Sequence, residues 1–286
     1  AGKGARGLGR SHLLNSEPVM EFLTIFLSSL IALVSPAGLV LDRVAENAVR
    51  SQFKSVEQLQ IRVDNAPSYQ VIQGKAEKVR IAGRGLFPLP EFRIAALEVE
   101  TDPIDVNPRG GKGLKLDRPL QAGVHLVLTQ ADINRALSSP TVTKRLRDLS
   151  VRVLDDSEAK QVQRYDFLNP QVELLANNRI RAKVELQEQG QSDRLQITVE
   201  SGLAVVAGKR VQLVEPHISV NGEAVPQEIL DPIARGVTER FDLDQLAGPD
   251  VTARLLQLKV VPEQQIDIVA FVRAETPTTP PTTKPN

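Results

Sequence analysis

The feature that most constrains the fold is a change of hydrophobic period between residues 39 and 86. From residue 39 to 56, apolar residues recur at the spacing of one helix face, which predicts a long amphipathic helix. The apolar positions of this segment are Leu41, Val44, Ala45, Ala48, Val49, Phe53 and Val56. The period then drops to two, because Leu59, Ile61 and Val63 alternate with polar residues, as in a strand with one buried face. Such a helix and such a sheet each need a cover, so the simplest fold packs one against the other.

The sequence therefore predicts an α+β fold over residues 39–275, in which a strongly curved antiparallel β-sheet wraps the long amphipathic N-terminal helix. Two further helices are expected. One begins at Thr129, whose hydroxyl can cap the helix while Asp132 completes a capping box. The other covers about residues 227–241. The pairs Asn177-Asn178 and Gly208-Lys209 separate alternating segments and predict β-hairpins, and Asn221-Gly222 predicts a further turn.

One predicted strand, residues 92–100, changes its apolar face along its length. Phe92 and Ile94 share one face, whereas Leu97 and Val99 share the other. A slip of one residue reverses the two faces of a strand, so a bulge is expected near residues 95 and 96. Residues 102–113, rich in Asp, Pro and Gly, are expected to form a long loop.

The two ends of the chain differ in composition from its middle. Residues 1–19 are predicted to be a disordered extension, and the Pro- and Thr-rich residues 276–286 a disordered tail. No residue from 22 to 41 is charged, which in a helix gives about 30 Å of apolar length. Residues 20–38 are therefore expected to be a signal peptide or an uncleaved membrane anchor, although a buried core helix stays open. Met20 is the only methionine in the sequence. Two starts of translation therefore stay open: Met20 itself, or an initiator methionine before Ala1 that was removed.

Composition and motifs exclude several classes of function. Lys+Arg and Asp+Glu both number 35, so there is no basic field for nucleic acid. There is no Cys, and the three His lack a second ligand at metal spacing, so neither a metal site nor a cofactor is expected. No catalytic motif and no paired catalytic carboxylates occur in a recognisable frame. The chain is therefore expected not to be an enzyme.

Four runs of the sequence indicate a family. They are VEQLQIRV at 56–63, GKAEKVRIAGRGL at 74–86, VETDPIDVNP at 99–108 and LTQADINRAL at 128–137. Together they resemble the LmeA-like phospholipid-binding family, the last two resembling its cyanobacterial branch, over about residues 39–273. The resemblance implies a tubular lipid-binding type of fold around an apolar cavity, in an exported or membrane-bound protein. It implies no invariant catalytic residues.

The predicted function is binding or transfer of a phospholipid or glycolipid, without catalysis, at the outer face of a membrane, on the periplasmic or thylakoid-lumen side. The alternative is an envelope assembly or scaffold protein whose apolar groove holds a segment of an unknown protein partner. The predicted lining of the acyl-chain cavity comprises Val44, Val49, Ile61, Val63, Val79, Ile81, Leu97, Val99, Val184, Leu186, Ile197 and Val199. The residues predicted to meet anionic headgroups are Lys75, Lys78, Arg80 and Arg84.

Overall fold

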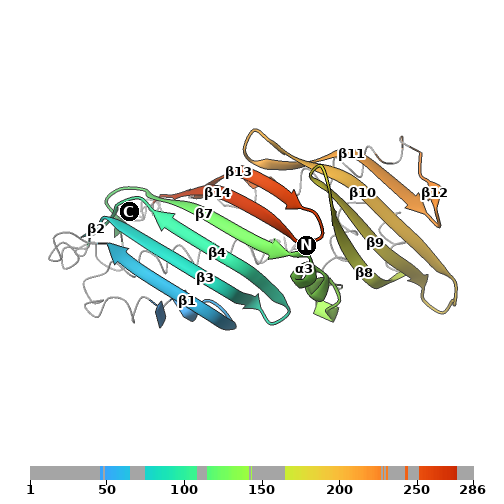
Figure 1. Ribbon diagram of the computed structural model, residues 1–286, viewed down its shortest axis with the longest axis horizontal. Helices are drawn as coiled ribbons and strands as arrows, with labels where there is room; N and C mark the ends of the chain where they lie inside the picture. The colour runs from blue at the N-terminus through green and yellow to red at the C-terminus, as the bar shows by residue number, and fades with distance from the viewer. Residues whose placement is uncertain are drawn as a thin grey trace, which may run out of the picture.

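The computed structural model describes residues 46–47, 49–64, 75–107, 115–141, 143, 165–226, 228, 230, 242–243 and 251–275. Antiparallel strands dominate this part of the chain (Figure 1). The strands are β1 (Ser55–Asp64), β2 (Lys75–Ala76), β3 (Lys78–Leu89), β4 (Phe92–Thr101), β5 (Ile104–Asn107), β6 (Lys115–Leu116), β7 (Leu120–Thr129), β8 (Tyr165–Leu175), β9 (Arg179–Glu188), β10 (Arg194–Val206), β11 (Arg210–Val220), β12 (Glu223–Ala224), β13 (Val251–Val261) and β14 (Gln265–Ala274). Among the described residues, the helix with assigned bounds is α3 (Gln130–Leu137).

The strands form two large sheets and one small one. The six-stranded sheet has the order β1-β3-β4-β7-β14-β13, and the five-stranded sheet has the order β12-β11-β10-β9-β8. The short strands β2, β5 and β6 make a three-stranded sheet. In Figure 1 the two large sheets lie side by side along the long axis of the molecule, with α3 between them. Strand β13 supplies much of the junction, because Leu255 N donates to Gly208 O and Val260 N donates to Asn178 Oδ1.

The six-stranded sheet carries the main core on one face. Ile61, Ile81, Val99 and Val124 form one row across four strands, as the register of β1, β3, β4 and β7 requires. The first three are nearly inaccessible to solvent, and Val79 and Leu97 beside them are buried as well. Alternation along each strand therefore separates a buried apolar face from a charged one.

The predicted fold class is wrong in two respects. The described part of the chain contains separate sheets instead of one curved sheet around a helix, and α3 is its one helix with assigned bounds. Val49 lies in a helical turn and packs in the core, but that turn ends at Arg50. Phe53 lies in a bend, and Val56, predicted as a helix position, is part of β1. The spacing of apolar residues does not show where a helix ends. The predicted helix also contains no Gly or Pro that would mark its end in the sequence.

The change of apolar face in β4 is real, but its predicted cause is wrong. The pairing of β3 with β4 is regular through Ala96, and the register shifts only between Leu86 and Leu89 of β3. The change of face in β3 coincides with Gly85, whose φ of 58° is left-handed. Leu86 then packs against Gly83, in the space that a side chain at Gly83 would fill. A glycine in β3, with no extra residue in β4, produces the switch.

Replacing Gly85 by alanine is expected to destabilise the domain by about 2 kcal/mol, because alanine is strained at this φ and its Cβ would overlap the carboxyl group of Glu57. Gly190→Ala is the matched control. Gly190 also has a left-handed φ, of 87°, but no atom lies within 4 Å of a Cβ there. Urea unfolding should show the larger loss for Gly85→Ala, and equal losses would mean that the contact with Glu57 contributes nothing.

The hairpins of the five-stranded sheet confirm the predictions from turn residues. Asn177 and Asn178, with φ of 59° and 58°, connect β8 to β9. Ala207 and Gly208, with φ of 53° and 66°, begin the turn between β10 and β11. Each turn has three residues, 176–178 and 207–209, and two successive left-handed residues reverse the chain within it. The register set at each turn changes once along its hairpin, between Leu168 and Gln171 in β8 and between Glu200 and Gly202 in β10.

Helix α3 begins where the sequence predicts, and it ties the two large sheets together. The hydroxyl of Thr129 accepts from the backbone N of Asp132, which confirms the predicted cap. The side-chain amide of Asn134 donates to Val172 O at 2.9 Å and accepts from Val172 N at 2.7 Å. Gln130 Oε1 accepts from Leu174 N. These side chains form hydrogen bonds with backbone groups at the outer edge of β8.

Other sequence predictions meet the structure only in part. The expected loop after residue 101 is wrong at residues 104–107, which form β5 between β2 and β6. The predicted signal or anchor, both terminal segments and most of the third helix lie outside the described residues. Within the described residues, no helix has the length and hydropathy needed to cross a membrane.

Candidate functional site

The five-stranded sheet has an apolar face that its own chain leaves half open. One row across it joins Val184, Ile197 and Val220, and the neighbouring row joins Val172, Ala182, Val199 and Ile218. We call the following residues the open apolar face: Phe167, Val172, Ala182, Val184, Leu186, Leu195, Ile197, Val199, Ile218 and Val220. All are half-buried except Leu195, which is 37% exposed. In contrast to the core of the six-stranded sheet, this face keeps solvent contact along its whole length.

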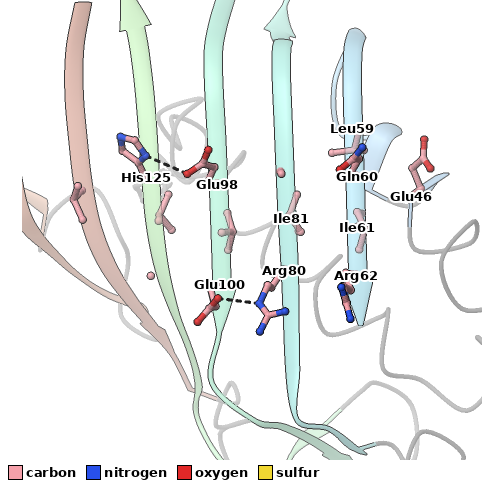
Figure 2. A pocket seen from close by; sticks show the side chains of 15 residues that line it. Glu46, Leu59, Gln60, Ile61, Arg62, Arg80, Ile81, Glu98, Glu100 and His125 are labelled. Atoms are coloured by element: carbon pink, nitrogen blue, oxygen red, sulfur yellow. Dashed lines mark hydrogen bonds and ion pairs between the residues drawn. The ribbon is translucent and has the colours of Figure 1, made fainter. Parts of the chain in front are cut away.

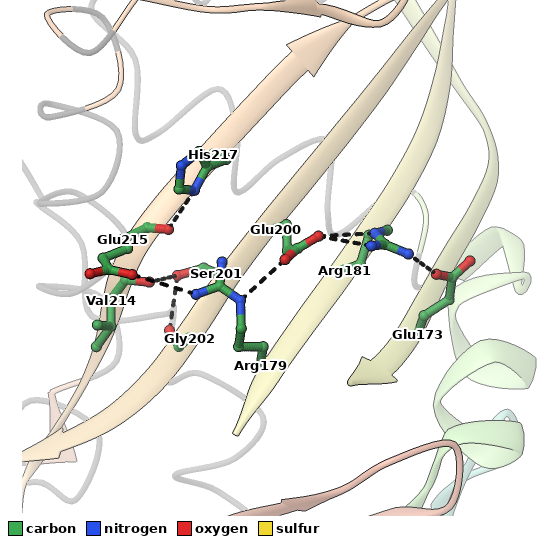
Figure 3. A network of polar contacts seen from close by, with 9 residues as sticks. All are labelled: Glu173, Arg179, Arg181, Glu200, Ser201, Gly202, Val214, Glu215 and His217. Atoms are coloured by element: carbon green, nitrogen blue, oxygen red, sulfur yellow. Dashed lines mark hydrogen bonds and ion pairs between the residues drawn. The ribbon is translucent and has the colours of Figure 1, made fainter. Parts of the chain in front are cut away.

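The opposite face of the same sheet is covered by ion pairs (Figure 3). Arg181 lies between two carboxylates, donating to Glu173 Oε2 at 2.9 Å and to Glu200 Oε2 at 2.9 Å. Arg179 Nε donates to the other oxygen of Glu200 at 3.1 Å, and Lys183 Nζ to the other oxygen of Glu173 at 2.6 Å. The two faces therefore differ sharply: one is charged and internally paired, and the other is apolar and unpaired.

These ion pairs shift the titration of the carboxylates. Hydrogen bonds from Lys183 and then Arg181 lower the pKa of Glu173 below its ordinary value of 4.5. The hydrogen bond from Arg181 is the main cause that lowers the pKa of Glu200; burial raises this pKa by a smaller amount, and the hydrogen bond from Arg179 lowers it by less again. Both groups favour the ionised state in the folded chain.

The pH dependence of stability follows from these lowered pKa values. A carboxylate with a lower pKa in the folded state contributes stability that is fully present above the unfolded value, here 4.5, and is lost as pH falls through the folded value. The urea concentration at the unfolding midpoint should therefore decrease as the pH is lowered below about 4.5. The decrease should be less steep in a Glu173→Gln, Glu200→Gln double variant. Parallel pH profiles of the variant and the wild type would contradict the assignment.

A second candidate is a cavity of about 900 Å³ on the six-stranded sheet (Figure 2). The side chains of Arg80, Glu98, Glu100 and His125, which alternate with the buried residues of their strands, belong to the charged face. Ala82 and Gly123 leave room between them. The cavity size suits a small ligand, and its lining combines these charged side chains with apolar residues such as Leu59, Val124 and Val269.

The predicted apolar lining is divided between the two sheets. Val49, Ile61, Val79, Ile81, Leu97 and Val99 are buried in the core cluster, and Val63 packs against it. Ile61, Ile81 and Val99 are also among the residues that line the 900 Å³ cavity. Val184, Leu186, Ile197 and Val199 instead lie together on the open apolar face. Val44 is outside the described residues. Val184, Leu186, Ile197 and Val199 are therefore the predicted lining residues that stay half-buried outside the core cluster.

The four cations predicted to meet headgroups all have carboxylate partners. The pairs are Lys75 with Asp105 at 3.2 Å, Lys78 with Glu100 at 2.6 Å, Arg80 with Asp64 at 2.7 Å and with Glu100 at 3.0 Å, and Arg84 with Glu98 at 3.1 Å. The pairs of Lys78, Arg80 and Arg84 run along the charged face of the six-stranded sheet, whereas Lys75 and Asp105 lie on β2 and β5 of the three-stranded sheet. A headgroup at these residues would have to compete with the carboxylates already bound.

The sequence analysis missed several members of the open apolar face, including Phe167, Leu195 and Val220. The missing signal was cross-strand pairing. The register set at the Asn177-Asn178 turn would place Phe167 opposite Gln187, and a register shift between Leu168 and Gln171 brings it opposite Leu186 instead. His125 contacts Glu98 at 3.4 Å and Asp267 at 3.5 Å. No cluster of three metal-ligating side chains occurs in the part of the chain described here.

Comparison with known families shows the family to which the chain belongs. The family model for LmeA-like phospholipid-binding proteins matches residues 33–265. The match covers most of the chain, and this protein therefore belongs to the LmeA-like phospholipid-binding family. No match was found among curated proteins or among solved structures.

Proposed function

We infer that this protein is a non-enzymatic phospholipid-binding protein that holds acyl chains against the open apolar face of its five-stranded sheet. The observation that carries this proposal is the contrast between the two faces of that sheet. Its charged face is satisfied by ion pairs such as Arg181 with Glu200, whereas its apolar face stays half exposed. A contiguous row of apolar side chains that stays half exposed on a folded chain is typical of a binding site.

The dimensions of this face support the proposal. Strand β9 has 10 residues, so at about 3.3 Å per residue it extends about 33 Å, longer than an extended chain of about 16 carbons. Moving such a chain from a bilayer into water would cost about 12 kcal/mol, at about 0.8 kcal/mol per methylene. A carrier must therefore offer continuous apolar contact, and the rows through Val184 and Val199 offer it across four strands.

We further propose that the bound lipid is a phospholipid or glycolipid that the protein takes from, and returns to, the outer face of a membrane. Family membership supports the phospholipid class. A carrier also has no need of catalytic groups. Transfer requires a site that opens to the surface, and the open apolar face meets that requirement because its residues retain solvent contact.

Incubation of the full chain with phospholipid vesicles, followed by gel filtration and mass spectrometry of the protein peak, tests this function. The expected result is stoichiometric phospholipid in the protein peak, together with movement of labelled lipid from donor to acceptor vesicles. A protein peak free of lipid, with no transfer above the rate without protein, would contradict the proposal.

A further inference from the structure

The open apolar face has one closed end and one open end. The row nearest the six-stranded sheet includes Leu174 and Ser201, which are 0% and 1% exposed. Six residues further along β9, or about 20 Å, the last apolar row includes Phe167, which is half-buried, and Leu195, which is 37% exposed. Solvent access therefore increases away from the six-stranded sheet, toward the turn between β9 and β10 (Figure 1).

The polar groups at the closed end are paired within the chain. Leu174 N donates to Gln130 Oε1 at 2.7 Å, and Leu174 O accepts from Glu263 N at 2.9 Å. The hydroxyl of Ser201 donates to Gly202 O at 2.9 Å. What this end offers a ligand is therefore apolar contact. Such contact suits hydrocarbon, whereas a phosphate would lose its hydration there without compensation.

The open end finishes in two polar side chains that lack a partner. Tyr165 and Glu188 pair across β8 and β9, one row beyond Phe167. Because side chains alternate along a strand, both point to the apolar side of the sheet. Both are half-buried, and neither side chain has a hydrogen bond or ion pair with a described residue. A phenol donates a hydrogen bond and a carboxylate accepts several, so this pair can bind a group that has both an acceptor and a donor.

We propose that the bound lipid lies along the open apolar face with its acyl ends at the closed end and its headgroup at Tyr165 and Glu188. The Tyr165 hydroxyl donates to a phosphate oxygen, and the Glu188 carboxylate accepts from an N–H or O–H group of the same headgroup. The inference rests on the proposed function, and it adds the direction of the lipid and the class of its headgroup. Headgroups that carry such donors are favoured over choline, whose nitrogen has no N–H.

Fluorescence quenching tests the direction of the lipid, because the chain has no Trp and one introduced Trp reports on one place. Phe167→Trp reports on the open end. Val199→Trp reports on a row about 13 Å nearer the closed end, where Ala182 opposite leaves room for the ring. Each variant is loaded with phosphatidylethanolamine that carries bromine near the carboxyl end or near the methyl end of an acyl chain. Bromine near the carboxyl end should quench Phe167→Trp more strongly, and bromine near the methyl end should quench Val199→Trp more strongly.

The comparison of two bromine positions within one variant does not depend on how completely that variant is loaded. The reverse order in both variants, or equal quenching by the two lipids, would overturn the proposed direction. Lipid found in the gel-filtered protein would then still support the proposed function. No quenching in either variant, together with a protein peak free of lipid, would contradict the proposed function as well.

Retention of phosphatidylethanolamine and phosphatidylcholine after gel filtration tests the headgroup contacts, since both lipids are zwitterionic and differ in N–H donors. The wild type should retain phosphatidylethanolamine about fivefold more strongly, and Glu188→Gln should reduce this preference to less than about twofold. Tyr165→Phe should weaken retention of both lipids about fivefold.

Thr198→Val is the control for these variants, because it removes a hydroxyl from the opposite face of the sheet. It should change neither retention by more than about twofold. Thermal melting checks that each variant is folded. Equal retention of the two lipids by the wild type, or a loss in Tyr165→Phe no larger than that in Thr198→Val, would overturn the proposed headgroup contacts.

Discussion

Replacing Ile197 by glutamate is expected to reduce phospholipid retention at least about tenfold. Ile197 is the centre of the row that joins Val184 to Val220 on the open apolar face. A carboxylate there would have to be buried beneath an acyl chain without a partner, which costs well over the 1.4 kcal/mol that corresponds to a tenfold change. Because the position is half-buried in the free chain, the charged side chain can reach water when no lipid is bound. Retention should therefore fall more than stability does.

Thr198→Glu is the matched control, because the next residue along β10 points to the opposite face. Thr198 pairs with Lys183 across the strands, so a glutamate at this position adds a carboxylate beside a cation on the charged face. Phospholipid retention by Thr198→Glu should stay within about twofold of the wild type. Mass spectrometry of the gel-filtered proteins measures both variants. Equal losses of lipid would mean that retention depends on the charge or stability of the sheet and not on its apolar face.

Replacing Asp132 by alanine is expected to destabilise the protein by about 3 kcal/mol, the largest loss of stability predicted here. Asp132 is 4% exposed and accepts from Arg93 at 2.9 Å, from Arg135 at 3.2 Å and from the Thr129 hydroxyl at 2.6 Å. Its loss would leave Arg93 with only the more exposed Glu57 as a partner. The change would also weaken the start of α3, the helix that joins the two large sheets.

Glu57→Gln provides the comparison for this variant. The hydrogen bond to Glu57 is the main cause that raises the pKa of Arg93, ahead of the bond to Asp132. Glu57 is nevertheless 51% exposed, so solvent screens its contribution and its removal should destabilise the protein less than the removal of Asp132 does. Urea unfolding of both variants decides the point. A loss for Glu57→Gln as large as that for Asp132→Ala would show that burial does not control the strength of this network.

The sequence predicted features that depend on a few neighbouring residues. The hairpins at Asn177-Asn178 and after Val206 follow from turn residues, and the start of α3 follows from the Thr129 cap. The length of the first helix was wrong, because an apolar spacing of three or four residues does not show where strand pairing takes over. Ser55 and Val56 join β1 because β3 pairs with them. The segment at 104–107 was misjudged because Pro103 and two aspartates obscured the alternation of Ile104 and Val106.

The predicted single curved sheet failed for a different reason. Hydrophobic period predicts which face of a strand is buried, but not which distant strand lies beside it. Strand β7 pairs with β14, more than a hundred residues away, and this pairing puts β13 and β14 in the first sheet. The predicted lining was therefore divided, since Ile81 and Val99 belong to a packed core whereas Val184 and Ile197 belong to an open face.

Photo-crosslinking tests most directly whether acyl chains lie on the open apolar face. The full chain would be loaded with a phospholipid that carries a photoreactive group near the end of one acyl chain, irradiated, digested and sequenced by mass spectrometry. Crosslinks are predicted on the strands that carry Val184, Ile197 and Val199, and they should be lost in Ile197→Glu. Crosslinks confined to the cavity beside Ala82 and Gly123, or to the core strand of Ile81, would contradict the account.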